Sequence, residues 1–436
     1  MPSPQPREGA RPEADDAPLR IAWLVYRGNP HCGGQGVYTR YVAREVARLG
    51  HHIEVLSGQP YPQLDDPAQL VEVPGLDLYR QPDPFRVPHV REFRDSVDIR
   101  EFGIMCLAGF PEPWAFTERA RRLLRQRRDD FDLVHDNQSL GTGILRMMDD
   151  GWPVTATIHH PITVDRELDL AHARTFRRRL TLRRWYGFLR MQLRVAPRIP
   201  RVVTVSESSR RDIAVQMGVP EESMTVVPIG VDETVFRPMP DVPRVPGRLM
   251  TTASADVPLK GLTILLEALA KARVERPDAH LVVIGRLKDG SGVPRLIDDL
   301  GLTGGVEFVS GVTDKRIVEL YAQAQLAVVP SLYEGFSLPA IEAMACGVPV
   351  LATTGGALPE VVGPDGDAAR TVKPGDPSEL ASVIVELLGD PEQRDRLGEA
   401  GRQRVLEKFT WHAHAVGLVE MWRAALAEQR DRDAHR

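Results

Sequence analysis

The sequence predicts an α/β protein that folds as two doubly wound domains, each built around a parallel sheet. First, 436 residues are more than one hydrophobic core usually organises. Second, short apolar runs typical of buried strands alternate with segments of helical period, beginning with Arg20–Tyr26, Val37–Leu49 and Ile53–Ser57. Third, this alternation occurs as two series, which the proline-rich residues 239–247 separate.

The first series occupies residues 19–238. It follows a tail at residues 1–18 that we expect to be disordered, because it is rich in proline and charge. Residues 59–113 interrupt the alternation with many prolines and little periodicity, so we expect a long excursion from the sheet, which is often functional. The alternation resumes with three strands, a helix and a last strand: Phe131–His135, Val154–Ile158, Arg201–Ser206, Ser208–Met217 and Met224–Val227.

The second series occupies residues 239–411, and we expect a final helix at residues 412–436 to pack back onto the first domain. Its expected strands are Leu249–Ala253, His280–Gly285, Val306–Val309, Leu326–Pro330 and Pro349–Thr353. Its expected helices are Gly261–Arg273, Pro294–Leu300, Lys315–Ala322, Leu338–Cys346, Pro377–Leu388 and Pro391–Lys408. Ligands of such sheets bind beyond the carboxyl ends of the strands, so we expect a site where these ends face the cleft between the domains.

The composition excludes several classes of protein. A net charge of −5 argues against a general nucleic-acid binder. Three cysteines without CxxC spacing or neighbouring histidines argue against a disulfide framework or a structural zinc and favour a reducing, cytoplasmic compartment. No apolar run is long enough to span a bilayer, and the first residues lack the apolar core of a signal peptide.

The most informative segment is residues 330–345, PSLYEGFSLPAIEAMA. A strand is expected to end at Pro330, a loop to carry Glu334 and Gly335, and a helix to begin near Leu338. The unpaired N–H groups and partial positive charge of a helix N-terminus suit a diphosphate. Glu334 could hold sugar hydroxyls from the loop, and Glu342, one turn inside the helix, could accept two ribose hydroxyls. The competing interpretation is an ordinary turn residue and a solvent-facing helix carboxylate.

This segment resembles the paired-glutamate motif of glycosyltransferase family 4 (GT4), whose members are retaining enzymes with the GT-B fold. Similar matches run from about residue 20 to residue 415 and are weakest at 59–130 and 165–200. They include the glycine pairs Gly33-Gly34 and Gly355-Gly356, the strand end at residues 203–207, residues 227–232 with Phe236, Lys260-Gly261 and residues 359–362. The resemblance implies two Rossmann-like domains, an N-terminal one for the acceptor and a C-terminal one for a nucleotide-sugar donor.

The resemblance also implies roles for individual residues. His159, rather than the adjacent His160, matches a histidine that touches the donor sugar, and Lys260 and Glu334 complete the implied catalytic set. A family arginine about five residues before Lys260 is replaced here by Ala255, and Arg286 is a candidate substitute. The remaining implied donor-binding residues include backbone contacts to the base from two later loops: Gly33, Gly34, Gly311, Val312, Gly335, Phe336, Ser337, Leu338 and Glu342.

The arginine-rich residues 174–194 contain eight arginines and no acidic residue. At 100° per residue, five apolar side chains share one helical arc. They are Leu182, Trp185, Tyr186, Leu189 and Leu193. Two interpretations stay open. Such a face suits an anionic membrane surface, which would place the protein at the inner face of the membrane, or it packs on its own domain with the arginines in solvent.

Acidic triplets that could hold a metal occur at Asp365–Asp367 and Asp431–Asp433, but neither ends a strand, so we predict that no metal is required. The sequence therefore predicts a retaining, hexosyltransferase-type glycosyltransferase. It would move a sugar from a UDP- or GDP-linked donor to an acceptor hydroxyl on a lipid-linked or small molecule. The alternatives are a nucleotide-sugar 2-epimerase of the same architecture and a non-catalytic nucleotide-sugar-binding protein, the latter because of Ala255.

Overall fold

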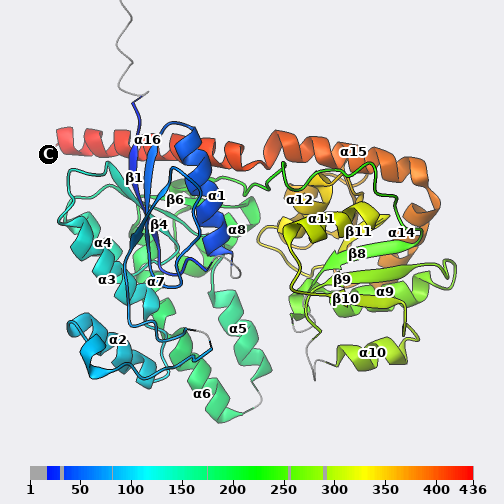
Figure 1. The fold of residues 1–436 in the computed structure, drawn as a ribbon, viewed down its shortest axis with the longest axis horizontal. Helices are drawn as coiled ribbons and strands as arrows, with labels where there is room; N and C mark the ends of the chain where they lie inside the picture. Colours follow the sequence, from blue (N-terminus) through cyan, green and yellow to red (C-terminus); the bar gives the residue numbers. More distant parts are fainter. Residues whose placement is uncertain are drawn as a thin grey trace, which may run out of the picture. The chain divides into compact units, whose positions relative to one another are not determined.

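The structure is a computed structural model that describes residues 17–29, 34–80, 82–173, 175–253, 257–287 and 292–435. Most of the expected N-terminal tail, Gly33 and Ala255 lie outside the described residues. The chain forms two compact units. Unit 1 comprises Met1–Val203, Gln216–Thr225 and Ala415–Arg436, and unit 2 comprises Thr204–Val215 and Val226–His414. Each unit contains one parallel sheet with helices on its faces (Figure 1).

The sheet of unit 1 has the strand order β3-β2-β1-β4-β5-β6-β7. Its strands are β1 (Arg20–Val25), β2 (His52–Ser57), β3 (Gln69–Glu72), β4 (Leu133–Asn137), β5 (Val154–Thr157), β6 (Arg201–Thr204) and β7 (Met224–Val226). Its helices are α1 (Gln35–Arg48), α2 (Ser96–Cys106), α3 (Glu112–Leu124), α4 (Thr142–Asp149), α5 (Thr163–His172), α6 (Phe176–Trp185) and α7 (Leu189–Val195). The strand order reverses direction between β1 and β4.

The core of unit 1 joins the sheet to the C-terminal helix α16 (Trp411–Ala434). Five of the six residues of β1 and all of β4 are buried, as expected for central parallel strands covered on both faces. The ring of Trp23 on β1 stacks on that of His135 on β4, with centroids 4.5 Å apart. Trp422 of α16 donates from Nε1 to His135 Nδ1 over 3.0 Å. Residues 415–436 therefore belong to unit 1.

The sheet of unit 2 has the strand order β10-β9-β8-β11-β12-β13. Its strands are β8 (Arg248–Thr252), β9 (His280–Ile284), β10 (Val306–Val309), β11 (Leu326–Val329), β12 (Val350–Thr353) and β13 (Arg370–Val372). Its helices are α9 (Leu262–Ala272), α10 (Val293–Asp299), α11 (Asp314–Gln323), α12 (Leu338–Ala345), α13 (Leu358–Val362), α14 (Pro377–Gly389) and α15 (Pro391–Lys408). The order reverses between β8 and β11.

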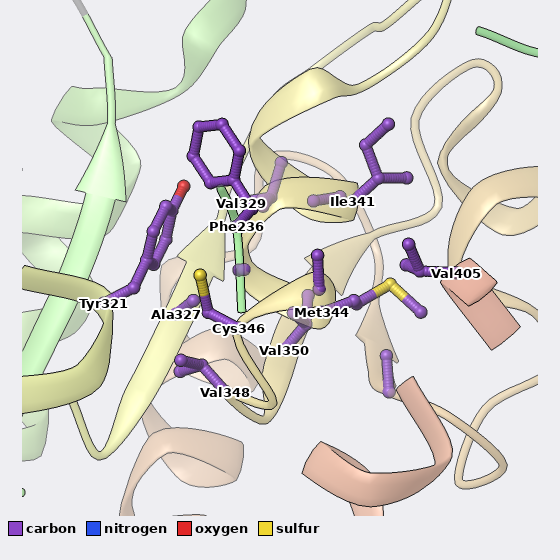
Figure 2. Close-up of a cluster of buried hydrophobic side chains, with 14 of the residues drawn as sticks. Phe236, Tyr321, Ala327, Val329, Ile341, Met344, Cys346, Val348, Val350 and Val405 are labelled. Carbon is purple, nitrogen blue, oxygen red and sulfur yellow. The ribbon is translucent and has the colours of Figure 1, made fainter. Parts of the chain in front are cut away.

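The two faces of this sheet bury two separate cores, because successive side chains of a strand point to opposite faces. Leu249 of β8 packs in the cluster that includes α9 and α14, and Met250 packs in the cluster that includes α11 and α12. Figure 2 shows the second cluster, in which Ile341 and Met344 of α12 approach side chains of β11 and β12. The buried face of α12 is thereby held in this core.

The units do not divide at residue 238, where the sequence series change. Val231 and Phe236 are buried in the α11–α12 core, so residues 226–238 pack with unit 2. The helix α8 (Glu207–Met217) begins in unit 2, since Thr204–Val215 belongs to it.

The expectation of a long irregular excursion at residues 59–113 is wrong in part. The segment contains the edge strand β3, which pairs in parallel with β2, and the helix α2. The exposed pattern of β3 gives no apolar alternation, and Asp95 caps α2 by accepting from Val97 and Asp98.

The arginine-rich residues do not form one continuous helix. A 3₁₀ turn, η2 (Tyr186–Phe188), separates α6 from α7. Trp185 and Phe188 contact Phe110, with ring centroids 5.0 and 5.4 Å apart, within a cluster that also holds Tyr79. This part of the predicted apolar face therefore packs on its own domain. Among the helices that the structure describes, none is both long and apolar enough to cross a membrane.

Candidate functional site

The donor-binding residues predicted in the second domain lie at one edge of the unit 2 sheet, because all the strands of this sheet whose pairing is described run parallel. Lys260 follows β8, and the segment from Ser331 to Leu338 follows β11. These two strands are neighbours, and the strand order reverses between them. Loops that leave such a point diverge to opposite faces and leave room for a ligand between them.

Lys260 and Glu334 form an ion pair at this point. The Nζ atom of Lys260 donates to both carboxylate oxygens of Glu334, over 2.8 and 3.0 Å. The hydroxyl of Ser331 donates to the same carboxylate over 2.7 Å. The Glu334 side chain is 8% exposed and that of Lys260 34%. The ammonium group of Lys260 is thus partly accessible to solvent, whereas the carboxylate of Glu334 is buried and held in a fixed orientation.

Glycines allow the loops that carry this pair to approach closely. Gly261 has a φ of +66°, and a Cβ atom there would lie 1.9 Å from the carbonyl oxygen of Pro330 at the end of β11. Gly356 has a φ of +64°, and a Cβ there would lie 2.2 Å from the Glu334 carbonyl oxygen. That oxygen accepts from Ala357 over 2.8 Å. Gly261 and Gly356 therefore have a geometric reason in this structure.

Helix α12 begins directly after Glu334. Ser337 occupies its N-cap position, but no side chain caps the helix, so its first N–H groups have no side-chain acceptor among the described residues. Gly335, Phe336 and Ser337 form the approach to the helix, and Phe336 packs its ring against Phe409, with centroids 5.9 Å apart. The first residue of the helix, Leu338, is exposed. An anion placed here would meet unpaired N–H groups and the positive end of the helix dipole.

Glu342 lies one turn inside α12, as predicted. Burial of its carboxyl group, reinforced by the negative charge of Asp314, raises the pKa of Glu342 to about 7. No hydrogen bond to this carboxyl group is among those described. A carboxyl group that has a raised pKa and no hydrogen-bond partner among the described residues is a candidate for contact with a ligand.

The residues expected near the base follow the two outer strands of the same sheet. Arg286 follows β9 and is exposed. Gly311, with a φ of +69°, and Val312 follow β10. Because β10 is at the edge of the sheet, these loops lie at the same carboxyl edge as Lys260 but farther from the point of reversal.

Sequence reasoning missed several residues that hold the Glu334 loop. The hydroxyls of Ser206 and Ser209 donate to the carbonyl oxygen of Gly335 over 2.6 and 3.1 Å. The carboxylate of Glu360 accepts from the backbone N–H groups of Glu207 and Ser208 over 2.7 and 2.8 Å and so caps the first turn of α8. Residues 203–207 and 359–362 both belong to segments that resemble the family. No periodicity or spacing links them to each other, which is why their contact could not be foreseen.

The predicted residues of the first domain lie in unit 1. Gly34 is at the N-cap of α1 with a φ of +74°, and its neighbour Gly33 lies outside the described residues. His159 follows β5, and its ring meets the ring of Tyr38 on α1 edge to face, with centroids 4.6 Å apart. His160 is exposed, and its backbone carbonyl accepts a hydrogen bond from Gln138. Gly34 and His159 thus follow β1 and β5 at the same carboxyl edge of their sheet.

In the described part of the chain, no group of three or more histidine, cysteine or acidic side chains is arranged to hold a metal ion.

Comparison with known proteins gives matches over nearly the whole chain. The family models described as "Glycosyltransferase Family 4" and "Glycosyl transferases group 1" match residues 32–235 and 245–404. The MMP alpha-(1->4)-mannosyltransferase of Mycolicibacterium hassiacum is 51% identical over 410 residues, which cover 94% of this chain and 99% of that protein.

A second relative is more distant. The GDP-mannose-dependent alpha-(1-6)-phosphatidylinositol monomannoside mannosyltransferase of Mycolicibacterium smegmatis is 30% identical over 235 residues, 50% of this chain and 61% of that protein. Among solved structures, sucrose-phosphate synthase from Thermosynechococcus elongatus superposes with a TM-score of 0.70. It shares 22% sequence identity, with 94% of this chain and all of that one covered, and this likeness bears on the fold alone.

Proposed function

The chain belongs to glycosyltransferase family 4 and has the GT-B fold, and from this premise we propose that it is a retaining α-(1→4)-mannosyltransferase. The observation that carries the choice of mannose is the 51% identity over almost the full length of both chains to the MMP alpha-(1->4)-mannosyltransferase. The acceptor that we propose first is the one in that name, MMP, ahead of the lipid-linked or small-molecule acceptors expected from the sequence.

The donor that we propose is a nucleoside diphosphate mannose. GDP is favoured over UDP because another matching mannosyltransferase is named as GDP-mannose-dependent. The N-terminus of α12 would receive the diphosphate, with Lys260 neutralising its charge. Glu342 would accept the two ribose hydroxyls, and Glu334 would accept hydroxyls of the mannose. Arg286 is our candidate for the second cation, and Gly311 and Val312 for the base.

The proposed reaction needs no side-chain nucleophile. The acceptor hydroxyl forms a bond to the mannose C1 on the face that the diphosphate leaves, and the bond from C1 to the phosphate oxygen breaks. The hydroxyl proton passes to that departing oxygen. From an α-linked donor this gives an α-linked product, as in the relative's name. The carboxylate of Glu334, already bound by Lys260 and Ser331, is oriented for hydrogen bonds rather than for attack.

Assays with purified protein test this proposal. We expect turnover of GDP-mannose with an α-(1→4)-linked mannooligosaccharide acceptor, little turnover of UDP-glucose, and an α-anomeric product by ¹H NMR. Glu334→Ala and Lys260→Ala should each abolish transfer. A β-linked product would refute retention. Tight donor binding without turnover over a panel of acceptors would instead support a non-catalytic binding protein, and formation of a 2-epimeric sugar nucleotide would support the epimerase.

We further propose that α6 contacts an anionic membrane surface. Its side chains Phe176 and Leu180, one turn apart on the same face, are 77% and 41% exposed. Four exposed arginines surround them and make no ion pair within the described residues: Arg177, Arg178, Arg183 and Arg184. Exposed apolar side chains ringed by cations are suited to the headgroup region of anionic lipids.

Sedimentation with phosphatidylglycerol-rich liposomes tests the membrane proposal. We expect the protein to sediment at low salt, and expect Phe176→Ser with Leu180→Ser, or Arg183→Gln with Arg184→Gln, to prevent it. Val274→Ser, which changes another strongly exposed apolar side chain, is the matched control and should sediment like the parent. Equal sedimentation of all variants, or none of the parent, would overturn the proposal. Trp185 is not the residue to change, because its ring packs against Phe110.

A further inference from the structure

The loop after β4 contacts the segment that carries His159. Strands β4 and β5 are paired in parallel, with Asn137 opposite Thr157. His159 therefore emerges two residues beyond β5, beside the residues that leave β4. Asn137 at the end of β4 and the loop residues Gln138 and Ser139 are buried, although all three are polar.

Asn137 contacts the imidazole of His159 directly. Its Oδ1 atom lies 2.9 Å from His159 Nε2. An amide oxygen only accepts hydrogen bonds, so this contact requires a hydrogen on Nε2. The amide nitrogen of Asn137 approaches Thr39 Oγ1 at 3.5 Å, and that hydroxyl already accepts from Trp23 Nε1 over 3.2 Å. These contacts direct the amide nitrogen toward Thr39 and the amide oxygen toward the imidazole.

Gln138 holds the backbone on either side of the same imidazole. Its Oε1 atom accepts from the His159 N–H over 2.8 Å, and its Nε2 atom donates to the His160 carbonyl over 2.7 Å. One side-chain amide thus bonds the backbone before His159 and after His160. The peptide group before His159 and the one after His160 cannot rotate without breaking one of these bonds.

The loop is kept in an unfavourable backbone conformation. Gln138 and Leu140 have φ values of +54° and +50°, a region that costs side-chain-bearing residues on the order of 1 kcal/mol or more. Asp136 stabilises the turn by accepting from the Leu140 N–H over 2.8 Å and from the Ser139 hydroxyl. Gln192 of α7 donates to the Ser139 carbonyl over 3.1 Å. Strain that surrounding contacts maintain is typical of functional positions.

We propose that Asn137 and Gln138 are positioning residues for His159: Asn137 fixes the imidazole tautomer with hydrogen on Nε2, and Gln138 fixes the backbone. This inference rests on the proposed function and on the role that the family resemblance implies for His159, contact with the donor sugar. Misplacement of a reacting group by about 1 Å can cost about 100-fold in rate, so small changes in this loop matter.

Kinetics of matched variants test the positioning role. We expect Asn137→Ala and Gln138→Met to lower kcat by about 10- to 100-fold while KM for the acceptor stays within about threefold. Gln138→Glu keeps the acceptor for the His159 N–H and should retain intermediate activity. Gln138→Gly relieves the positive φ and should not lower Tm, yet should lose as much kcat as Gln138→Met. Gln126→Ala, an exposed glutamine, is the control.

A spectroscopic measurement separates this inference from the proposed function. The imidazole ¹⁵N shifts of His159, assigned by comparison with His159→Gln, should indicate the Nε2–H tautomer in the parent and a mixture in Asn137→Ala. Unchanged shifts and unchanged kcat in Asn137→Ala and Gln138→Gly would overturn the positioning role. If the expected shifts are seen but His159→Ala keeps full activity, the positioning of His159 by Asn137 and Gln138 would be supported. The role of His159 in transfer would then be refuted.

Discussion

Lys260→Met is expected to destabilise unit 2 more than Glu334→Gln, although each substitution removes the same ion pair. Lys260→Met leaves a carboxylate that is 8% exposed and that has, among the described residues, only the Ser331 hydroxyl as a remaining side-chain partner. Glu334→Gln leaves an ammonium group on a side chain that is 34% exposed, where water can replace the lost partner. An uncompensated buried charge costs far more than an exposed one.

The burial of the two groups sets the magnitudes. Breaking a fully buried pair costs about 3–5 kcal/mol, and partial solvation of the Lys260 side chain reduces this to about 2 kcal/mol for Lys260→Met. For Glu334→Gln we expect about 1 kcal/mol or less. In a unit of this size each kcal/mol shifts Tm by about 2–4 °C. Differential scanning calorimetry should therefore separate the two variants by several degrees, although both lose transferase activity.

The double variant Lys260→Met with Glu334→Gln should be more stable than Lys260→Met alone, because it no longer buries a carboxylate without its cation. Lys271→Met is the control, since Lys271 on α9 makes an exposed contact to Ser378 and should leave Tm and activity nearly unchanged. Equal losses in the two single variants, or additive losses in the double variant, would refute the reasoning that the carboxylate is held by Lys260.

Three further predictions concern pH and packing. The affinity for GDP-mannose should increase severalfold between pH 6 and pH 8, as measured by calorimetry. The reason is that Glu342, with its pKa of about 7, ionises over this range, whereas the diphosphate does not titrate near neutrality. In Glu342→Gln the affinity should be weaker and independent of pH, and the same slope in both proteins would contradict this. Burial raises the pKa of Glu112 to about 8, so its contribution to stability is present below its unfolded pKa and is lost as pH rises through 8. Relative to the parent, the free energy of unfolding of Glu112→Gln should thus increase by on the order of a few kcal/mol between pH 5 and pH 9 in denaturant titrations. A difference in unfolding free energy that stays constant over this range would refute the raised pKa. Gly261→Ala would place a Cβ 1.9 Å from the Pro330 carbonyl oxygen. The substitution should therefore lower Tm by several degrees and weaken donor binding at least 10-fold. Unchanged Tm and affinity would show that the approach of the two loops is not required.

The sheet of unit 2 could be predicted closely because its strands are short, apolar and separated by glycine or proline. The expected strand Leu326–Pro330 and helix Leu338–Cys346 differ from β11 and α12 by one residue each. Parallel strands place their carboxyl ends at one edge, so Lys260, Arg286, Gly311 and Glu334 could be expected to share that edge from sequence order alone. The short β13 could not be foreseen, because three residues carry too little pattern.

The arginine-rich segment shows why helical periodicity alone was insufficient in unit 1. The predicted apolar arc assumed an uninterrupted helix, but η2 changes the direction of the chain between Trp185 and Leu189. Trp185 then packs against Tyr79 and Phe110, residues about 105 and 75 positions earlier. The side chains left exposed, Phe176 and Leu180, precede the whole predicted arc. Contacts between segments this distant in sequence decide which face is buried, and periodicity does not contain them.

The candidate site shows the same limit in the pairing of Lys260 with Glu334. The motifs assign each residue to a different part of the donor, the cation to the diphosphate and the carboxylate to the sugar. In the structure each is the principal partner of the other. An ammonium has three donors and a carboxylate about four acceptor positions, so the pair can take up a phosphate oxygen and a sugar hydroxyl without separating. Diphosphate binding at Lys260 would therefore also fix the orientation of Glu334 toward the sugar, and a nucleotide without its sugar would meet a site whose carboxylate is already in place.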